Sequence, residues 1–143
     1  MTDRFENKAF YAGNSMRREF VPGDLLETRE IPFGEIRVGD VVAFREPRPD
    51  AHAIVHRVIA READCLVTMG DNNATPDAHR VTVEDNPRLV VARSPRAGVE
   101  LSVARGARGR LVFRWHRVRR FARRVAGALW RRTFGSLFRG RRG

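Results

Sequence analysis

The sequence has one cysteine in 143 residues, Cys65, so no disulfide bond can form within the chain. Cysteine usage therefore gives no sign of an oxidising compartment. No uninterrupted apolar stretch approaches the ~18–20 residues that cross a bilayer. The first residues, MTDRFENKAFYAG, lack an apolar core and include acids, unlike a secretory signal peptide. These absences predict a cytoplasmic protein without a signal peptide or transmembrane helix.

Acidic residues are missing from one end of the chain. All 17 aspartates and glutamates lie within residues 1–100, together with 14 of the 28 basic residues. Residues 101–143 contain the other 14 basic residues, all of them arginine, and no acid. This asymmetry indicates that the C-terminal tail meets an anionic partner. Composition alone leaves open whether that partner is a membrane or a nucleic acid.

Residues 1–103 also lack any long stretch of helical periodicity. Instead, short runs rich in β-branched residues alternate with turns formed by Gly, Pro, Asp and Asn. This spacing is typical of a compact, mainly β domain. We expect its strands within residues 25–30, 41–44, 53–62, 65–69, 88–94 and 99–103.

Residues 104–143 follow a different pattern and form the second predicted segment. After the breaker-rich stretch 104–110, apolar residues recur at helical intervals, and arginines fill most positions between them, as in a basic amphipathic helix. Gly127 and Gly135 each cost a helix roughly 0.5–1 kcal/mol relative to alanine, so the helix can be interrupted there. The apolar positions are Leu111, Trp115, Val118, Phe121, Ala122, Val125 and Leu129.

Ser15 lies in the segment GNSMRREFVPGD, at positions 13–24. A serine on a glycine-containing turn can project its hydroxyl clear of the backbone while nearby amides point at the same space. A nucleophile beside an oxyanion hole needs this geometry. A serine in a turn is more often only a turn former, so this segment alone does not identify a site.

Two further segments carry groups that could assist Ser15. His56 interrupts the apolar run AIVHRVIA, and a histidine can take a proton from a serine because its unperturbed pKa is ~6.5. In the polar loop GDNNATPD, at 70–77, a carboxylate of Asp71 or Asp77 could orient the imidazole and stabilise its charged form. Each segment also has a simpler interpretation, as a hydrogen-bonded core histidine and as Asx turns.

In this order, GNSM…PGD, VGDVVAF, IVHRV and MGDNN…D resemble the conserved boxes of type I signal peptidases, over about residues 10–93. More narrowly, they are similar to the endoplasmic-reticulum, archaeal and sporulation-type branch. Its boxes contain serine–methionine, glycine–aspartate, isoleucine–valine–histidine–arginine and glycine–aspartate–asparagine–asparagine. The bacterial branch and the LexA-type self-cleaving repressors use lysine as the base, and the corresponding position here is His56.

The resemblance implies a largely antiparallel β fold and a serine endopeptidase that cleaves a protein or peptide after small residues, the A-x-A preference of export signals. It matches Ser15 to the nucleophile and His56 to the general base. Asp77 matches the carboxylate of the triad, and Asp71 the other acidic position of the same loop. The chain departs from the family pattern at Arg18, at Pro76 and in having no spanning segment.

A zinc site built from His52, His56, His79 and Asp71 is the metal-binding alternative. In a strand, His52 and His56 lie about 13 Å apart at ~3.3 Å per residue. Two ligands of one zinc ion each lie ~2 Å from it, so this pair cannot share an ion. We therefore expect neither a metal nor a cofactor.

Two other classes of function remain open. One is a non-catalytic binding protein on the same fold, whose arginine-rich tail binds nucleic acid with Trp115, Phe121, Trp130 and Phe134. The other is a LexA-like self-processing regulator, which is disfavoured because the single lysine of the chain, Lys8, precedes the matching region. For the tail, we expect residues 108–138 to bind an anionic membrane surface, which gives the protein a peripheral membrane association.

Overall fold

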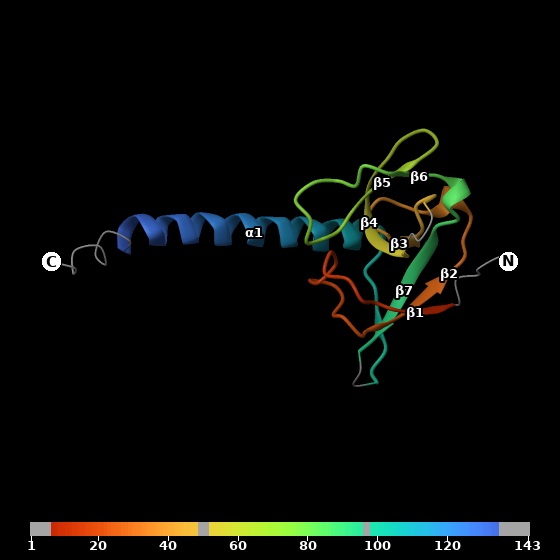
Figure 1. The fold of residues 1–143 in the computed structure, drawn as a ribbon, viewed down its shortest axis with the longest axis horizontal. Helices are drawn as coiled ribbons and strands as arrows, with labels where there is room; N and C mark the ends of the chain where they lie inside the picture. Colours follow the sequence, from red (N-terminus) through yellow and green to blue (C-terminus); the bar gives the residue numbers. More distant parts are fainter. Residues whose placement is uncertain (1–6, 49–51, 96–97, 135–143) are drawn as a thin grey trace. The chain divides into compact units, whose positions relative to one another are not determined.

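The computed structural model describes residues 7–48, 52–95 and 98–134. Within these residues the chain forms one sheet of eight strands, two short 3-10 helices and one long α-helix (Figure 1). The mainly β fold class predicted from the sequence is therefore confirmed. The strands are β1 (Lys8–Phe10), β2 (Leu25–Arg29), β3 (Val41–Phe44), β4 (Ile54–Arg61), β5 (Leu66–Met69), β6 (Arg80–Val81), β7 (Arg88–Ser94) and β8 (Leu101–Ser102). The 3-10 helices are Phe33–Glu35 and Val83–Asp85, and the helix α1 is Gly106–Phe134.

The strands lie in the order β1-β2-β7-β3-β4-β5-β6, with β8 paired to β7, and every pairing is antiparallel among the described strands. Strand β7 therefore lies between β2 and β3, which are both far from it in the sequence (Figure 1). Six strands fall within the predicted segments. The other two, β1 and β6, have three and two residues, which is too short for an alternating pattern to be recognised.

Strand β3 is buried on both faces of the sheet, at all four of its residues. Successive side chains of a strand point to opposite faces, so its first and third residues join one apolar cluster and its second and fourth join another. Met16 and Phe20 belong to the first cluster and are completely buried. The segment that carries Ser15 is thus held to the sheet by the side chains that follow it.

Helix α1 begins earlier than the apolar period predicts, because the glycines of segment 104–110 allow a close backbone contact. A Cβ atom on Gly109 would lie 2.0 Å from the carbonyl oxygen of Gly39, and a Cβ on Gly39 would lie 2.0 Å from that of Gly106. Gly39 also has φ +102°, which residues with a side chain rarely adopt. Asp40 Oδ1 accepts a 2.9 Å hydrogen bond from the Gly106 N–H, one of the first amides of the helix.

Helix α1 runs without interruption through Gly127 to Phe134, and Gly135 lies outside the described residues. The chain divides into two compact units, Met1–Phe113 and Arg114–Gly143, and the division falls inside α1. The first turns of the helix thus belong to the same unit as the sheet. Over the described ranges, no helix combines the length and the apolar character needed to cross a membrane.

Candidate active site

Ser15 begins a helical turn that is packed tightly against the loop after β5. Phe20 N–H donates to the carbonyl of Met16 at 2.8 Å, which closes the turn, and Asn72 N–H donates to the carbonyl of Ser15 at 2.7 Å. A Cβ atom on Gly70 would lie 2.8 Å from both the Cβ and the carbonyl oxygen of Ser15. The absence of a side chain at Gly70 therefore allows Ser15 its position.

His56 lies on β4, is buried, and contacts one carboxylate of the predicted pair. Its Nδ1 atom lies 2.5 Å from Asp77 Oδ2. Because an ionised carboxylate can only accept, Nδ1 carries the proton in this contact, and Nε2 of the neutral imidazole keeps its lone pair. This is the tautomer in which a histidine can act as a base through Nε2.

Asp77 is fixed by strand β5 as well as by His56. Thr68 Oγ1 donates to Asp77 Oδ2 at 2.7 Å, and the Asp77 N–H donates to the Thr68 carbonyl at 2.9 Å. The loop therefore returns to the strand from which it left. The carboxylate is held in one orientation by the hydroxyl and the imidazole together.

Ser15 and His56 line one cavity of about 540 Å³. The other lining residues come from two segments, 10–13 and 52–55, which lie before Ser15 and before His56 in the chain. In this structure no hydrogen bond among the described residues joins Ser15 Oγ to His56. The structure thus brings the predicted nucleophile and base to a common cavity, and the predicted triad carboxylate to the base.

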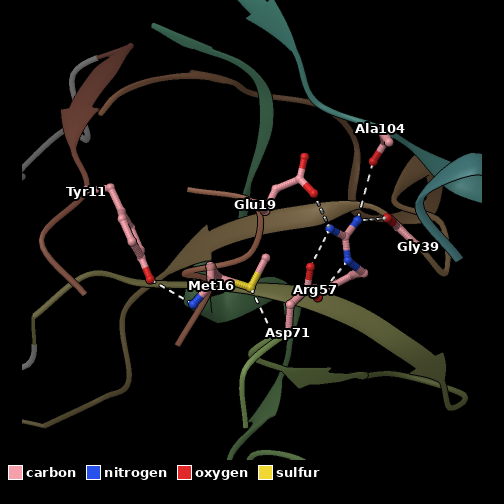
Figure 2. A network of polar contacts seen from close by, with 7 residues as sticks. All are labelled: Tyr11, Met16, Glu19, Gly39, Arg57, Asp71 and Ala104. Atoms are coloured by element: carbon pink, nitrogen blue, oxygen red, sulfur yellow. Dashed lines mark hydrogen bonds and ion pairs between the residues drawn. The ribbon is translucent and has the colours of Figure 1, made fainter. Parts of the chain in front are cut away.

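Asp71 takes a different place from Asp77, in a buried network with Arg57 (Figure 2). Arg57 Nε donates to Asp71 Oδ1 at 2.9 Å and Arg57 Nη2 donates to Oδ2 at 2.8 Å, so the pair is bidentate. Both side chains are fully buried, at 0% exposure. Arg57 also donates to the Gly39 carbonyl at 2.9 Å and to Glu19 Oε2 at 3.4 Å.

The arginine network connects the site to several distant segments. Glu19 lies in the turn that Ser15 begins, Asp71 in the loop that ends at Asp77, and Gly39 at the contact with the start of α1. A weaker bond, at 3.5 Å, joins Arg57 Nη1 to the carbonyl of Ala104 (Figure 2). The loops that present Ser15 and Asp77 are therefore held by one guanidinium.

Met16 and Tyr11 add a second connection between the same loops. The Met16 N–H donates to Tyr11 Oη at 2.8 Å, and the Asp71 N–H lies 3.2 Å from Met16 Sδ (Figure 2). The amide after Ser15 is thus bonded to a tyrosine, so it is not directed at the cavity as an oxyanion donor in this structure.

Sequence reasoning assigned no role to four residues that shape the site: Tyr11, Arg57, Thr68 and Gly70. Arg57 follows His56 in the sequence IVHR, and its position in an apolar strand is the signal that could have identified it. A charged residue in such a run is rarely buried without a partner of opposite charge. Tyr11 and Thr68 act through contacts with residues far away in the sequence, and no local pattern identifies those contacts.

Two other histidines differ in their relation to the site. His52 lines the same cavity as Ser15 and His56, whereas His79 Nε2 contacts Asp85 Oδ2 at 3.0 Å. Partial burial raises the pKa of the Cys65 thiol above its ordinary value, and a hydrogen bond to Glu62 raises it further. A raised pKa disfavours the reactive thiolate, and Cys65 is not among the described residues that line the cavity. Ser15 is therefore the better candidate nucleophile.

No protein-family model, curated protein or solved structure matches this chain. The interpretation of the site consequently rests on the residues and geometry of this chain.

Proposed function

We propose that this protein is a serine endopeptidase of the signal-peptidase type, with Ser15 as nucleophile, His56 as general base and Asp77 as the carboxylate that orients the base. The observation that carries the proposal is the 2.5 Å contact of His56 with Asp77 beside a cavity that His56 shares with Ser15. The motif resemblance supports the same three residues. Asp71 positions the loop through Arg57 and does not touch the reacting atoms.

In the proposed reaction, Ser15 Oγ attacks the carbonyl carbon of the peptide bond and its proton passes to His56 Nε2. The carboxylate of Asp77 stabilises the imidazolium through Nδ1. As the C–N bond breaks, His56 returns the proton to the leaving amine, and an acyl-enzyme ester remains on Ser15. Water, deprotonated by the same imidazole, then attacks the ester and releases the acid and the free serine.

The pairing of strand β4 supports an extended peptide as the substrate. On one side, residues 54–57 pair with β3. On the other side, the register with β5 begins only at Arg57, so residues 54–56 have no strand partner there among the described residues. This open edge lies at the cavity, since Ile54 and Val55 line it. An extended chain can add to such an edge by backbone hydrogen bonds and so bring a peptide bond to Ser15.

The test is cleavage of a small library of peptides with A-x-A before the cut, by the wild type and by Ser15→Ala. The matched control is Ser102→Ala, because Ser102 is an exposed serine on strand β8. We expect Ser15→Ala to remove turnover, by ~10³-fold or more, and the control to retain it. A fluorophosphonate probe should label the wild type and Ser102→Ala but not Ser15→Ala. Turnover by folded Ser15→Ala would contradict the proposal.

A further inference from the structure

Large apolar side chains form an exposed stripe along α1. At 3.6 residues per turn, spacings of three, four and seven residues bring side chains to one side of a helix. The apolar stripe consists of Leu111, Trp115, Val118, Phe121 and Val125, which are exposed by 65%, 60%, 60%, 71% and 41%. Arg114 has the same helical spacing and lies at the border of the stripe, beside Phe121, where a long arginine side chain can extend its charge toward the polar side. An exposed apolar stripe of this length marks a surface for a partner.

In the first turns of the helix, Leu111, the first residue of the stripe, does not lie on the side that packs on the sheet. There the backbone of Gly109 contacts that of Gly39, while Leu111 is exposed. Two residues along a helix correspond to about 200° of rotation, so Leu111 lies nearly opposite Gly109. The sheet therefore does not cover Leu111, with which the stripe begins.

The side of the helix away from the stripe is arginine-rich. Arg117, Arg120, Arg123 and Arg124 lie there by the same helical spacing. Residues 101–143 contain 14 arginines and no acidic residue, so the segment as a whole is strongly positive. Arg119 places its guanidinium over the ring of Trp115 at 5.9 Å, at the border between the two sides. Such a pair suits a boundary between lipid chains and headgroups, where tryptophan and arginine are both stable.

We propose that α1 binds an anionic bilayer surface, with the apolar stripe in the headgroup boundary and the arginines on lipid phosphates. Positive charge alone fits any polyanion, and Trp115 and Phe121 also suit stacking on bases. The aliphatic members of the stripe, Leu111, Val118 and Val125, favour lipid, because they bury in the headgroup boundary but do not stack on bases. The surface covers Leu111–Val125, within the predicted range 108–138, of which residues 135–138 lie outside the described residues. The proposal does not depend on peptidase activity.

The two tryptophans of the chain, Trp115 and Trp130, both lie on α1, so intrinsic tryptophan fluorescence reports on this helix alone. Full-length protein is titrated with vesicles of phosphatidylcholine and with vesicles that also contain phosphatidylglycerol. We expect a blue shift and co-sedimentation only with the anionic vesicles, and release as salt rises, because salt screens the arginine–phosphate attraction.

Two variants that each lower the net charge by one unit distinguish binding to lipid from binding to nucleic acid. Arg123→Gln removes charge from the arginine side, and Val118→Glu adds a negative charge within the stripe. For anionic vesicles we expect about five-fold weaker binding for Arg123→Gln and a further ten-fold or greater loss for Val118→Glu. Far-UV circular dichroism checks that both variants keep the helix.

Three results would overturn the proposal. The first is failure of the full-length protein to bind anionic vesicles at low salt. The second is equal weakening by the two variants, with tighter binding to RNA or DNA than to vesicles, which would make the tail a nucleic-acid site. The third is concentration-dependent dimerisation that Val118→Glu abolishes, which would assign the stripe to a second copy of the chain.

Discussion

His56 and Arg57 are neighbours on strand β4, and each binds a different aspartate of the same loop. His56 Nδ1 contacts Asp77, and Arg57 forms a bidentate pair with Asp71. Successive strand residues point to opposite faces of a sheet, so the loop places one carboxylate on each side of β4. The two aspartates therefore have separable roles. Asp77 contacts the proposed base, and Asp71 pairs with the arginine that holds the loops of the site together.

This separation predicts different effects of two isosteric changes. Asp77→Asn removes the charge that stabilises the imidazolium and can present the wrong tautomer of His56, so kcat should fall by orders of magnitude, up to ~10⁴-fold. Asp71→Asn weakens the pair with Arg57 and should mainly lower stability. Peptide turnover and thermal unfolding, measured on both variants, distinguish the two effects. A larger loss of kcat in folded Asp71→Asn would reverse the roles.

Arg57→Met should strongly destabilise the fold, because it leaves the buried carboxylate of Asp71 without its partner. Breaking a buried pair in this way costs about 3–5 kcal/mol of unfolding free energy. Arg48→Met is the control, since Arg48 pairs with Glu46 at the surface and is 70% exposed, and such pairs contribute ~0–1 kcal/mol. Urea denaturation measures both. The double variant Arg57→Met/Asp71→Leu should recover part of the loss, because it also removes the unpaired charge.

Peptidase activity should fall as the pH is lowered from neutral. A general base must be unprotonated to accept the proton of Ser15, so protonation of the base removes catalysis. The pH profile of kcat/KM for a neutral peptide measures this, with His52→Ala as control, since His52 lines the same cavity without contacting Asp77. We expect His52→Ala to keep most of the activity and the same decline of kcat/KM at low pH. We expect His56→Ala to lose the activity. The opposite ranking would identify His52 as the base.

Gly70→Ala should reduce activity through the position of Ser15. The added Cβ would lie 2.8 Å from two Ser15 atoms, so the serine must move. A displacement of about 1 Å at a reacting group can cost ~100-fold in rate. Gly34→Ala adds the same methyl group where nothing lies within 4 Å, and it should leave kcat unchanged. Equal activity of the two variants would show that the Ser15–Gly70 contact is unimportant for catalysis.

Gly109→Ala and Gly127→Ala should change stability in opposite directions, although both glycines lie in α1. At Gly109 the new methyl group would meet the Gly39 carbonyl oxygen at 2.0 Å, and overpacking of this kind costs about 1–3 kcal/mol or more. At Gly127 nothing lies within 4 Å, so alanine should favour the helix by ~0.5–1 kcal/mol. Urea denaturation tests the first change. Helical circular dichroism on heating tests the second, and a loss of helix in Gly127→Ala would contradict it.

Local patterns were sufficient to predict the mainly β class, six of the strands and a basic helix near the C-terminus. Such patterns express preferences that act within a few residues: alternating burial, turn chemistry and helical spacing. The three proposed catalytic residues were also selected from the sequence, through the order and spacing of short boxes. Their catalytic roles remain predictions.

Contacts between distant segments decided the rest. Local patterns alone could not distinguish Asp71 from Asp77, because both lie in one polar loop, and only the motif resemblance matched Asp77 to the triad. The folded sheet brings Asp77 to His56 and Asp71 to Arg57. Local patterns also could not place the start of α1. Segment 104–110 contains Gly106 and Gly109, which weaken an isolated helix, yet in the fold Gly109 lets the helix backbone reach that of Gly39. In each case the deciding free energy comes from packing and ion pairing across the sheet, which no window of neighbouring residues contains.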